Sequence, residues 1–320
     1  MAQFTMRPSS ALMKKQRVLF VVSLVVPMLL ASCQYRLHEI PAPDEPEKVP
    51  VKISVKSIEQ IPFGSFATKA SVQETCTKLS YAVYSDLGDD SKEEFSVTQN
   101  STDSVFGVIS LNLSLGRHYI AVVGQNGGDG NPKFKNQAPN STYDSYSIRY
   151  SSNNTATPKV LDTFHYYAVI DVVRGENEFQ INLSRSVAMF RLKLTETIPS
   201  QVKQLVCTYN NCSYTLDVIN GCGCISNVKP EVFDVDSSMD TFDIYTFPMK
   251  GKSKMNMKVT ALDEYNNTLA EMDWKDVPIQ ANMITQYTGD LFQNGCKEYS
   301  QAEFPITVNN EWSGTDNHQF

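Results

Sequence analysis

The sequence predicts an all-β protein made of β-sandwiches. Apolar and polar residues alternate in many short runs after Pro50, which is the period-2 pattern of strands that bury one face. Gly, Asn, Asp and Ser separate these runs at short intervals, as turns between neighbouring strands do. A helical period is almost absent from the same stretch. Together these observations favour a sandwich over a helical or mixed architecture.

The alternating runs form two series. In the first series the predicted strands cover residues 51–55, 79–83, 95–97, 105–115, 119–123, 164–173 and 179–183. In the second series they cover residues 188–194, 205–209, 214–219, 231–235, 242–247, 255–261, 268–272, 284–287 and 304–308. At the border of the two series the apolar positions change from odd numbers, in the run 179–183, to even numbers, in the run 188–194. A rigid strand cannot change parity in this way, so residues 184–187 are predicted to form a bulge or the handover between two domains, 51–185 and 186–320.

The start of the chain is typical of an exported lipoprotein. Basic residues within 14–17 precede an apolar run of 13 residues, Val18 to Leu30. A membrane-spanning helix needs ~20 apolar residues, so this run is too short to cross a bilayer and indicates a signal peptide. Its end, Leu30-Ala31-Ser32-Cys33, resembles the lipobox of bacterial lipoproteins. Residues 1–33 are therefore predicted to be a lipoprotein signal peptide, with Cys33 as the lipid-modified first residue of the mature chain.

Residues 34–50 are predicted to be a tether between the lipid and the first strand. They contain four prolines and four acidic residues. This composition favours an extended spacer, which reaches about 50 Å at ~3.1 Å per residue. Without residues 1–33 the chain keeps 24 Lys and Arg against 35 Asp and Glu, a net charge of about −11. Such an acidic chain, with no dense basic stripe, is not expected to bind nucleic acid.

Six cysteines remain besides Cys33. They are Cys76, Cys207, Cys212, Cys222, Cys224 and Cys296. An even number in an exported chain is compatible with disulfides, whose pairing the sequence leaves open, and also with free buried thiols. The spacing of Cys222 and Cys224 is not that of a zinc knuckle and no His is nearby, so metal binding is disfavoured. No cofactor is expected apart from the covalent lipid.

The sequence contains no catalytic constellation that we can recognise. A Ser-His-Asp arrangement would need His118 or His165, and both fall in predicted strands. The motifs G-x-S-x-G and H-E-x-x-H are absent. The acidic loop from Asp234 to Asp243 has partial calcium-loop spacing but lacks the central Gly and the closing Glu, so a solvated turn is favoured. We therefore expect a protein that is not an enzyme.

A long segment, from Gly124 to Pro158, shows no sustained periodicity and is rich in Gly, Asn, Ser and Thr. It is predicted to be a mobile loop, because no GK[ST] or helix start follows its glycines to form a phosphate site. Tyr143, Tyr146 and Tyr150 lie within it at helix-like spacing. These tyrosines form either an aromatic binding face or, as we favour, contacts that hold the loop against its own domain.

The order of several motifs carries a family resemblance. After the lipobox come Leu79-Ser80-Tyr81-Ala82-Val83-Tyr84 with Asp86-Leu87-Gly88, Phe106-Gly107, Leu113-Ser114-Leu115-Gly116-Arg117-His118-Tyr119, Asp162-Thr163-Phe164-His165, Leu183-Ser184-Arg185-Ser186-Val187-Ala188, Tyr287-Thr288-Gly289-Asp290-Leu291 and Ile306-Thr307-Val308 ahead of Trp312. In this order they resemble the fimbrillin-A-associated anchor proteins of Bacteroidales bacteria. The resemblance covers nearly the whole mature chain.

That resemblance implies two tandem transthyretin-like β-sandwich domains and a role in surface fimbriae. Stalk subunits of such fimbriae lose their first strand by cleavage after an Arg and accept a neighbour's strand, a form of β-augmentation. Anchors keep both lipid and first strand. No Arg occurs here between Arg36 and Arg117, and Lys69 stands where such a cleavage site is expected. We therefore expect an outer-membrane lipoprotein, bound to the membrane by its lipid, that anchors or assists a fimbria and meets stalk subunits by strand complementation.

Two alternatives stay open. One is a surface lipoprotein that binds glycan through exposed aromatic residues, with Trp274, Trp312 and the three loop tyrosines as candidates. The other is a stalk pilin that is processed near Lys69. In the anchor interpretation, a sheet edge or the predicted strand 304–308 contributes to the joint, and residues 309–320 are a short polar tail.

Overall fold

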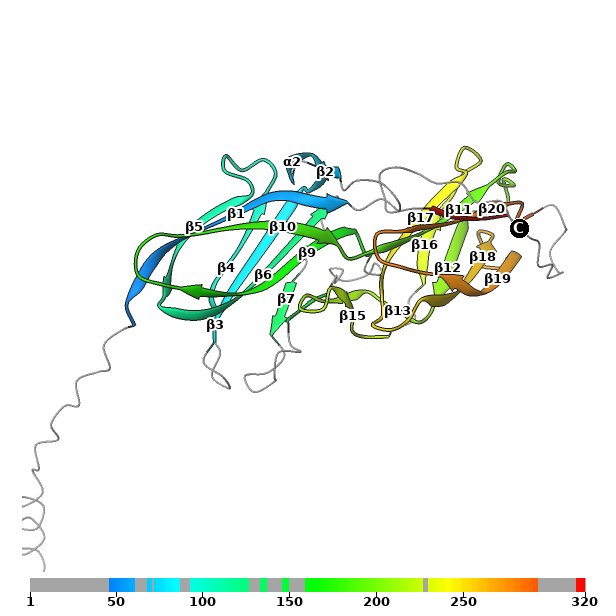
Figure 1. The fold of residues 1–320 in the computed structure, drawn as a ribbon. Helices are drawn as coiled ribbons and strands as arrows, with labels where there is room; N and C mark the ends of the chain where they lie inside the picture. The colour runs from blue at the N-terminus through cyan, green and yellow to red at the C-terminus, as the bar shows by residue number, and fades with distance from the viewer. Residues whose placement is uncertain are drawn as a thin grey trace, which may run out of the picture. The chain divides into compact units, whose positions relative to one another are not determined.

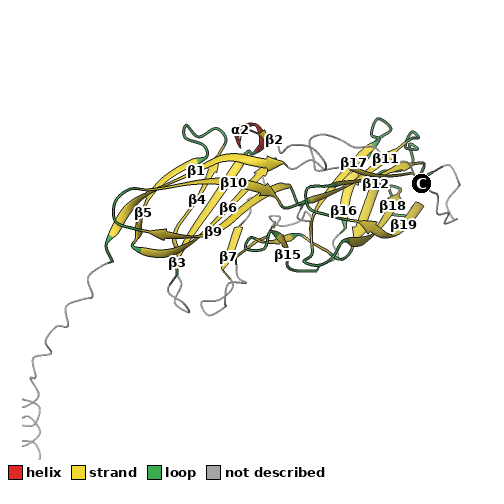
Figure 2. Ribbon diagram, in the orientation of Figure 1, coloured by secondary structure: helices red, strands yellow, loops and turns green. Residues whose placement is uncertain are grey.

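The structure, a computed structural model, describes residues 46–60, 68–70, 72–86, 93–126, 133–136, 146–149, 159–226, 230–292 and 315–319. Glu47–Phe320 is a single compact unit. Strands and loops make up nearly all of its described residues, and the helix that this part contains is the short α2 (Val72–Thr75) (Figure 2). The predicted all-β class is thus confirmed, whereas the division into two domains stays a prediction. No helix in the described part is long and apolar enough to span a bilayer.

The first sheet has eight strands and includes both ends of the first series. Its strands are β1 (Lys48–Gln60), β2 (Thr68–Ala70), β3 (Lys78–Ser85), β4 (Glu93–Asn100), β5 (Val108–Ser114), β6 (Gly116–Asn126), β9 (Asp162–Val172) and β10 (Asn177–Arg185). They follow the order β2-β1-β10-β9-β6-β3-β4, and β5 also pairs with β1. Figure 1 shows β1 and β10 running side by side.

This sheet folds over a core of its own. Strands β9 and β10 share only two residue pairs, Ser184 with His165 and Arg185 with Phe164. The sheet therefore divides at this point into β5-β1-β10 and β9-β6-β3-β4. Apolar residues from both parts, between Val49 and Leu183, form one buried cluster. The arrangement is that of a β-sandwich, as the alternation in the sequence predicts.

The described residues form three further sheets, built from the second half of the chain together with β7 and β8. The five-stranded sheet has the order β13-β17-β11-β20-β21, the next has the order β16-β12-β18-β19, and the third has the order β15-β14-β8-β7. Their bounds are β7 (Lys133–Asn136), β8 (Tyr146–Arg149), β11 (Ala188–Leu194), β12 (Gln204–Tyr209), β13 (Cys212–Ser213), β14 (Thr215–Asp217), β15 (Cys222–Gly223), β16 (Glu231–Asp234), β17 (Thr241–Pro248), β18 (Lys254–Leu262), β19 (Thr268–Pro278), β20 (Ile284–Gly289) and β21 (Thr315–Gln319). A second buried cluster runs from Ala188 to Leu291, and a third contains residues of both halves.

Four sequence-based boundaries are wrong. Strand β1 begins at Lys48, inside the predicted tether, because Val49 is apolar and packs in the core. The predicted strand 105–115 begins only at Val108, since Gly107 has a φ of +88° and Val105 lies exposed in a turn. The predicted mobile loop contains strands β7 and β8. Finally, the predicted polar tail contains β21. The predicted strand 304–308 lies outside the described residues.

The parity change at residues 184–187 is a handover between sheets. The chain leaves the first sheet at Arg185 and enters the five-stranded sheet at Ala188. Strand β11 then pairs with β17 on one side and with β20 on the other. The residues that face the core therefore belong to different sheets on either side of Ser186, which removes the conflict that a single strand would face.

Candidate functional site: the first strand and its surroundings

Strand β1 lies in the interior of its sheet. On one side it pairs in parallel with β10, from Val51 opposite Asn177 to Glu59 opposite Ser184. On the other side it pairs with β5 over seven residue pairs and with β2 over three. Both rows of backbone hydrogen-bonding groups are therefore engaged along most of the strand.

The apolar side chains of β1 fill the core of the first sheet. They are Val49, Val51, Ile53, Val55 and Ile58, and each is less than a tenth exposed. A register shift between Val55 and Ser57 explains why the buried positions change from odd to even numbers within the strand. The amide of Val55 donates to the carbonyl of Gly107 at 2.8 Å, where the glycine adopts its positive φ. The sequence pattern found Val51, Ile53 and Val55, but missed Val49 and Ile58.

Ion pairs border this strand on the solvent side. Lys52 lies 3.1 Å from Glu178 on β10, and both side chains are half exposed. Glu47, just before β1, accepts hydrogen bonds from Arg174 at 2.9–3.3 Å. Exposed pairs of this kind contribute little to stability, ~0–1 kcal/mol each. The strand is therefore held mainly by its backbone pairing and its buried side chains.

The structure places Lys69 in strand β2, where it pairs with Glu59 of β1. The sequence suggested Lys69 as a cleavage site. A protease needs an extended, unpaired segment around the bond that it cuts. The paired position of Lys69 therefore does not favour processing of this chain as a stalk subunit.

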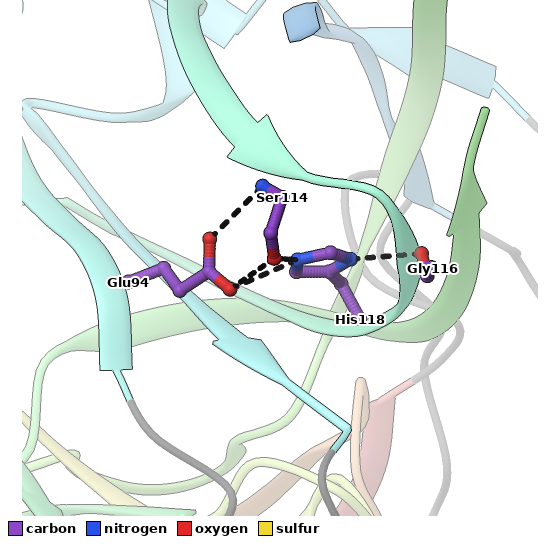
Figure 3. A network of polar contacts seen from close by, with 4 residues as sticks. All are labelled: Glu94, Ser114, Gly116 and His118. Atoms are coloured by element: carbon purple, nitrogen blue, oxygen red, sulfur yellow. Dashed lines mark hydrogen bonds and ion pairs between the residues drawn. The ribbon is translucent and has the colours of Figure 1, made fainter. Parts of the chain in front are cut away.

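A buried polar network joins β4, β5 and β6 beside the first strand (Figure 3). Ser114 donates to Glu94 from its hydroxyl at 2.6 Å and from its amide at 3.2 Å. His118 is buried, and its Nδ1 donates to the carbonyl of Gly116 at 3.0 Å. Its Nε2 lies 3.2 Å from the Ser114 hydroxyl and 3.3 Å from Glu94. Burial would raise the pKa of Glu94, but the hydrogen bonds from Ser114, with His118 nearby, outweigh it and hold the pKa below its usual value.

This network differs from a hydrolase triad. In a triad the acid contacts Nδ1 of the histidine and the serine proton goes to Nε2. Here Nδ1–H of His118 donates a hydrogen bond to a backbone carbonyl, and the hydroxyl of Ser114 donates to the carboxylate of Glu94. The geometry instead ties three strands together. The sequence offered no signal for this contact beyond the presence of His118.

Two motifs that carry the family resemblance meet where the chain passes between the sheets. Arg185 donates to both carboxylate oxygens of Asp162, at 2.8 and 3.0 Å, and its Nη1 donates to Asn282 at 3.0 Å. The hydroxyl of Ser186 lies 2.7 Å from Nδ1 of His165. Burial lowers the pKa of His165. A bidentate pair between largely buried partners fixes geometry strongly, so these residues hold β9, β10 and the turn before β20 together.

None of the five cysteines that the structure describes forms a disulfide with another of them. Cys76, Cys207 and Cys212 are buried, Cys222 is half-buried and Cys224 is exposed. Burial raises the pKa of Cys76 and of Cys212 to about 12, which keeps them in the unreactive thiol form. Cys33 and Cys296 lie outside the described residues. Pairing of any of these cysteines in an oxidising compartment stays a prediction.

The other candidates do not assemble into a binding site within the described part of the chain. Trp274 packs on the second core between Phe190 and Tyr287, with ring centroids 6.1 and 5.1 Å away. Asp243 binds Arg191 at 2.6 Å, and Asp236 accepts hydrogen bonds from Ser238. No group of three or more possible metal ligands occurs among the described residues. Trp312, Tyr143 and Tyr150 lie outside them, as does the side chain of Tyr146.

Several solved structures of Bacteroidales surface proteins are similar to this chain. A candidate adhesin from Bacteroides ovatus has a TM-score of 0.49 at 12% identity, over 81% of this chain and 95% of its own. The fimbrial anchor protein Mfa2 from Porphyromonas gingivalis has a TM-score of 0.45 at 10% identity, over 72% and 83%. A fimbrial assembly protein from Parabacteroides distasonis has a TM-score of 0.41 at 11% identity, over 77% and 92%.

These adhesins and fimbrial proteins are of the same kind as the family that the sequence resembles, the fimbrial anchor proteins of Bacteroidales. No protein-family model and no curated protein sequence matches the chain. Similarity of this degree assigns no role to any residue. The functional argument therefore rests on the geometry of β1 and its surroundings.

Proposed function

We propose that the chain is an outer-membrane lipoprotein that anchors or assists a fimbria and keeps its first strand. One observation carries this proposal: β1 is paired on both sides and buries five apolar side chains. Each such side chain stabilises the fold by ~1.5–3 kcal/mol when buried. The groove that a neighbour's strand would need is therefore occupied by the chain's own strand, which suits a subunit that ends or seats a fimbria.

The lipid on Cys33 would hold such a subunit at the membrane. The lipobox and the proline-rich segment before Lys48 support this part of the proposal. Strand complementation would supply contact with stalk subunits, because backbone hydrogen bonds give affinity without any catalytic group. Neither a cofactor nor an enzymatic step is part of the proposed function.

Intact-mass analysis of the protein from native membranes tests the proposal. We expect a lipidated species that begins at Cys33 and still contains β1. A dominant species that begins at Ala70 would instead make the chain a stalk pilin. As a companion test, Cys33→Ala is expected to leave the fold intact and to move the protein out of the membrane fraction. Membrane association of that variant after a salt wash, with its signal removed, would contradict lipid anchoring.

A further inference from the structure

Strand β5 has one backbone edge that no described strand pairs with. Its other edge pairs with β1 over seven residue pairs. The hydrogen bonds from Val55 to Gly107 and from Leu115 to Glu47 show that the odd-numbered residues point their amides and carbonyls toward β1. In an antiparallel ladder the residues between them point the other way. Val108, Ser110, Asn112 and Ser114 therefore turn their backbone groups outward.

Two side chains of β4 cover the ends of this outward edge. Gln99 donates to the carbonyl of Val108 at 2.8 Å, and its own carbonyl accepts from the amide of Gly107 at 2.9 Å. At the other end Glu94 accepts from the amide of Ser114, as described above. Side chains thus take the place of a neighbouring strand at both ends. The backbone groups of Ser110 and Asn112, in the middle, have no strand partner among the described residues.

The middle of the edge lacks the features that keep natural edges from pairing with other chains. Such edges carry Lys or Pro, contain a bulge, or are very short. Between Val108 and Ser114 the strand has none of these residues, and its register with β1 is regular. Ser110 and Asn112 are both exposed and small, while Ile109, Leu111 and Leu113 on the opposite face are buried. The edge is therefore regular and accessible, and the strand is held in place by the buried side chains on its other face.

We propose that this edge of β5 is where the protein takes up an extended strand from a fimbrial subunit. The proposal rests on the proposed function and names the surface that performs it. The incoming strand pairs with Ser110 and Asn112 and displaces the side chains of Glu94 and Gln99 from the ends. The side chains of Glu94 and Gln99 keep the ends of the edge covered until the partner arrives.

Charge around the edge indicates the chemistry of the partner. Glu93 and Glu94 lie at one end, and the exposed Asp103 lies in the turn that joins β4 to β5. Two of the nearest cations, Lys52 opposite Ser110 and Arg117 on β6, are engaged by Glu178 at 3.1 Å and by Asp86 at 3.3 Å, while Lys48 lies opposite Ser114. The carboxylates at the ends of the edge therefore favour a partner segment that carries basic residues. A second copy of this acidic chain would bring carboxylates against carboxylates, which disfavours self-pairing.

A proline at position 112 tests the proposal directly. Asn112→Pro removes the outward amide and leaves the hydrogen bonds to β1, which come from the odd-numbered residues, in place. Asn112→Ala is the matched control, because it changes the side chain and keeps the amide. The full mature chain of each form is immobilised and exposed to fimbriae sheared from the source cells, with mass spectrometry to identify the captured subunit. We expect capture about tenfold weaker for Asn112→Pro and nearly unchanged for Asn112→Ala.

A second variant tests the closing contacts. Gln99→Ala frees the carbonyl of Val108 and is expected to raise capture severalfold, provided that its melting curve matches the wild type. Bound fimbrial subunit should also slow amide exchange at Ser110 and Asn112. Equal capture by Asn112→Pro and Asn112→Ala, with both folded, would overturn the assignment of this edge and leave the proposed function standing. Capture of no fimbrial subunit by the wild-type chain would overturn both.

Discussion

The first and last strands that the structure describes, β1 and β21, are held in different ways. Strand β1 pairs on both sides and buries five apolar side chains, which together contribute roughly 10 kcal/mol. Strand β21 lies at the end of the five-stranded sheet and pairs in parallel with β20 alone. The comparison teaches that the position of a terminal strand within its sheet decides how easily the strand can detach. Strand β1 is held on both sides, whereas β21, the last described strand, is held on one side only.

Removal of β1 is the change with the largest expected effect. A chain that begins at Thr68 lacks both the buried side chains and the strand between β5 and β10, so we expect no cooperative unfolding transition. Circular dichroism during thermal unfolding measures this, with the chain from Gln34 onward as the control. A synthetic peptide of residues 48–60 should restore the transition when it is added. A cooperative transition of the shortened chain alone would show that β1 is dispensable and would break the comparison.

Arg185 sharpens the comparison, because it lies between the two sheets. It is the last residue of β10, in the sheet that holds β1, and it comes just before β11, in the sheet that holds β21. Its guanidinium is buried against Asp162 and Asn282. Arg185→Ala leaves a largely buried carboxylate without its partner, which costs about 3–5 kcal/mol of unfolding free energy. Lys52→Ala, which breaks the exposed pair with Glu178, should cost at most ~1 kcal/mol. Urea unfolding of both variants decides the point, and equal losses would contradict a structural role for the junction.

The same junction should respond to pH through His165. Burial lowers the pKa of this histidine in the folded state, whereas the unfolded chain keeps a value of about 6.5. Below that pH the histidine is protonated in the unfolded chain but stays neutral in the folded chain. The free energy of unfolding therefore falls as the pH drops. His165→Asn should flatten this dependence between about pH 7 and pH 5. Urea midpoints across that range provide the measurement, and parallel profiles for both proteins would exclude His165 as the cause.

Much of the fold could be predicted because burial follows a simple alternation. The odd-numbered pattern of Leu79, Tyr81 and Val83 and the even-numbered pattern of residues 188–194 both correspond to buried faces. The parity change between them marked the passage from one sheet to another. Strand β3 also buries its other face, since Ala82 and Tyr84 belong to the third cluster, and the alternation alone gave no sign of this.

The strands that were missed depend on partners far away in the sequence. Strands β7 and β8 form in a segment rich in Gly and Asn, and β8 pairs with β14, more than sixty residues later. Strand β21 lies in a polar tail and is ordered by its pairing with β20. Similarly, nothing local indicates that Glu94 reaches Ser114 or that Arg185 meets Asp162. The alternation of apolar residues predicts which face of a strand is buried, but it does not predict which strand pairs with its edge.

The smallest expected effect concerns β21 itself. Its His318 stacks on Tyr287 with ring centroids 4.4 Å apart, next to the aromatic contacts of Phe190 and Trp274. Loss of one ring contact at the edge of a sheet costs about 0.5–1.5 kcal/mol, so His318→Ala should lower the urea midpoint slightly and keep a single transition. Gln319→Ala, at an exposed position of the same strand, is the control and should have no effect. Tyr287 belongs to the second buried cluster whether or not β21 is present. Deletion of residues 315–320 should therefore lower the free energy of unfolding little more than His318→Ala does. A collapse of the cooperative transition on that deletion would show that β21 is as deeply integrated as β1, and the contrast between the two ends of the chain would then be wrong.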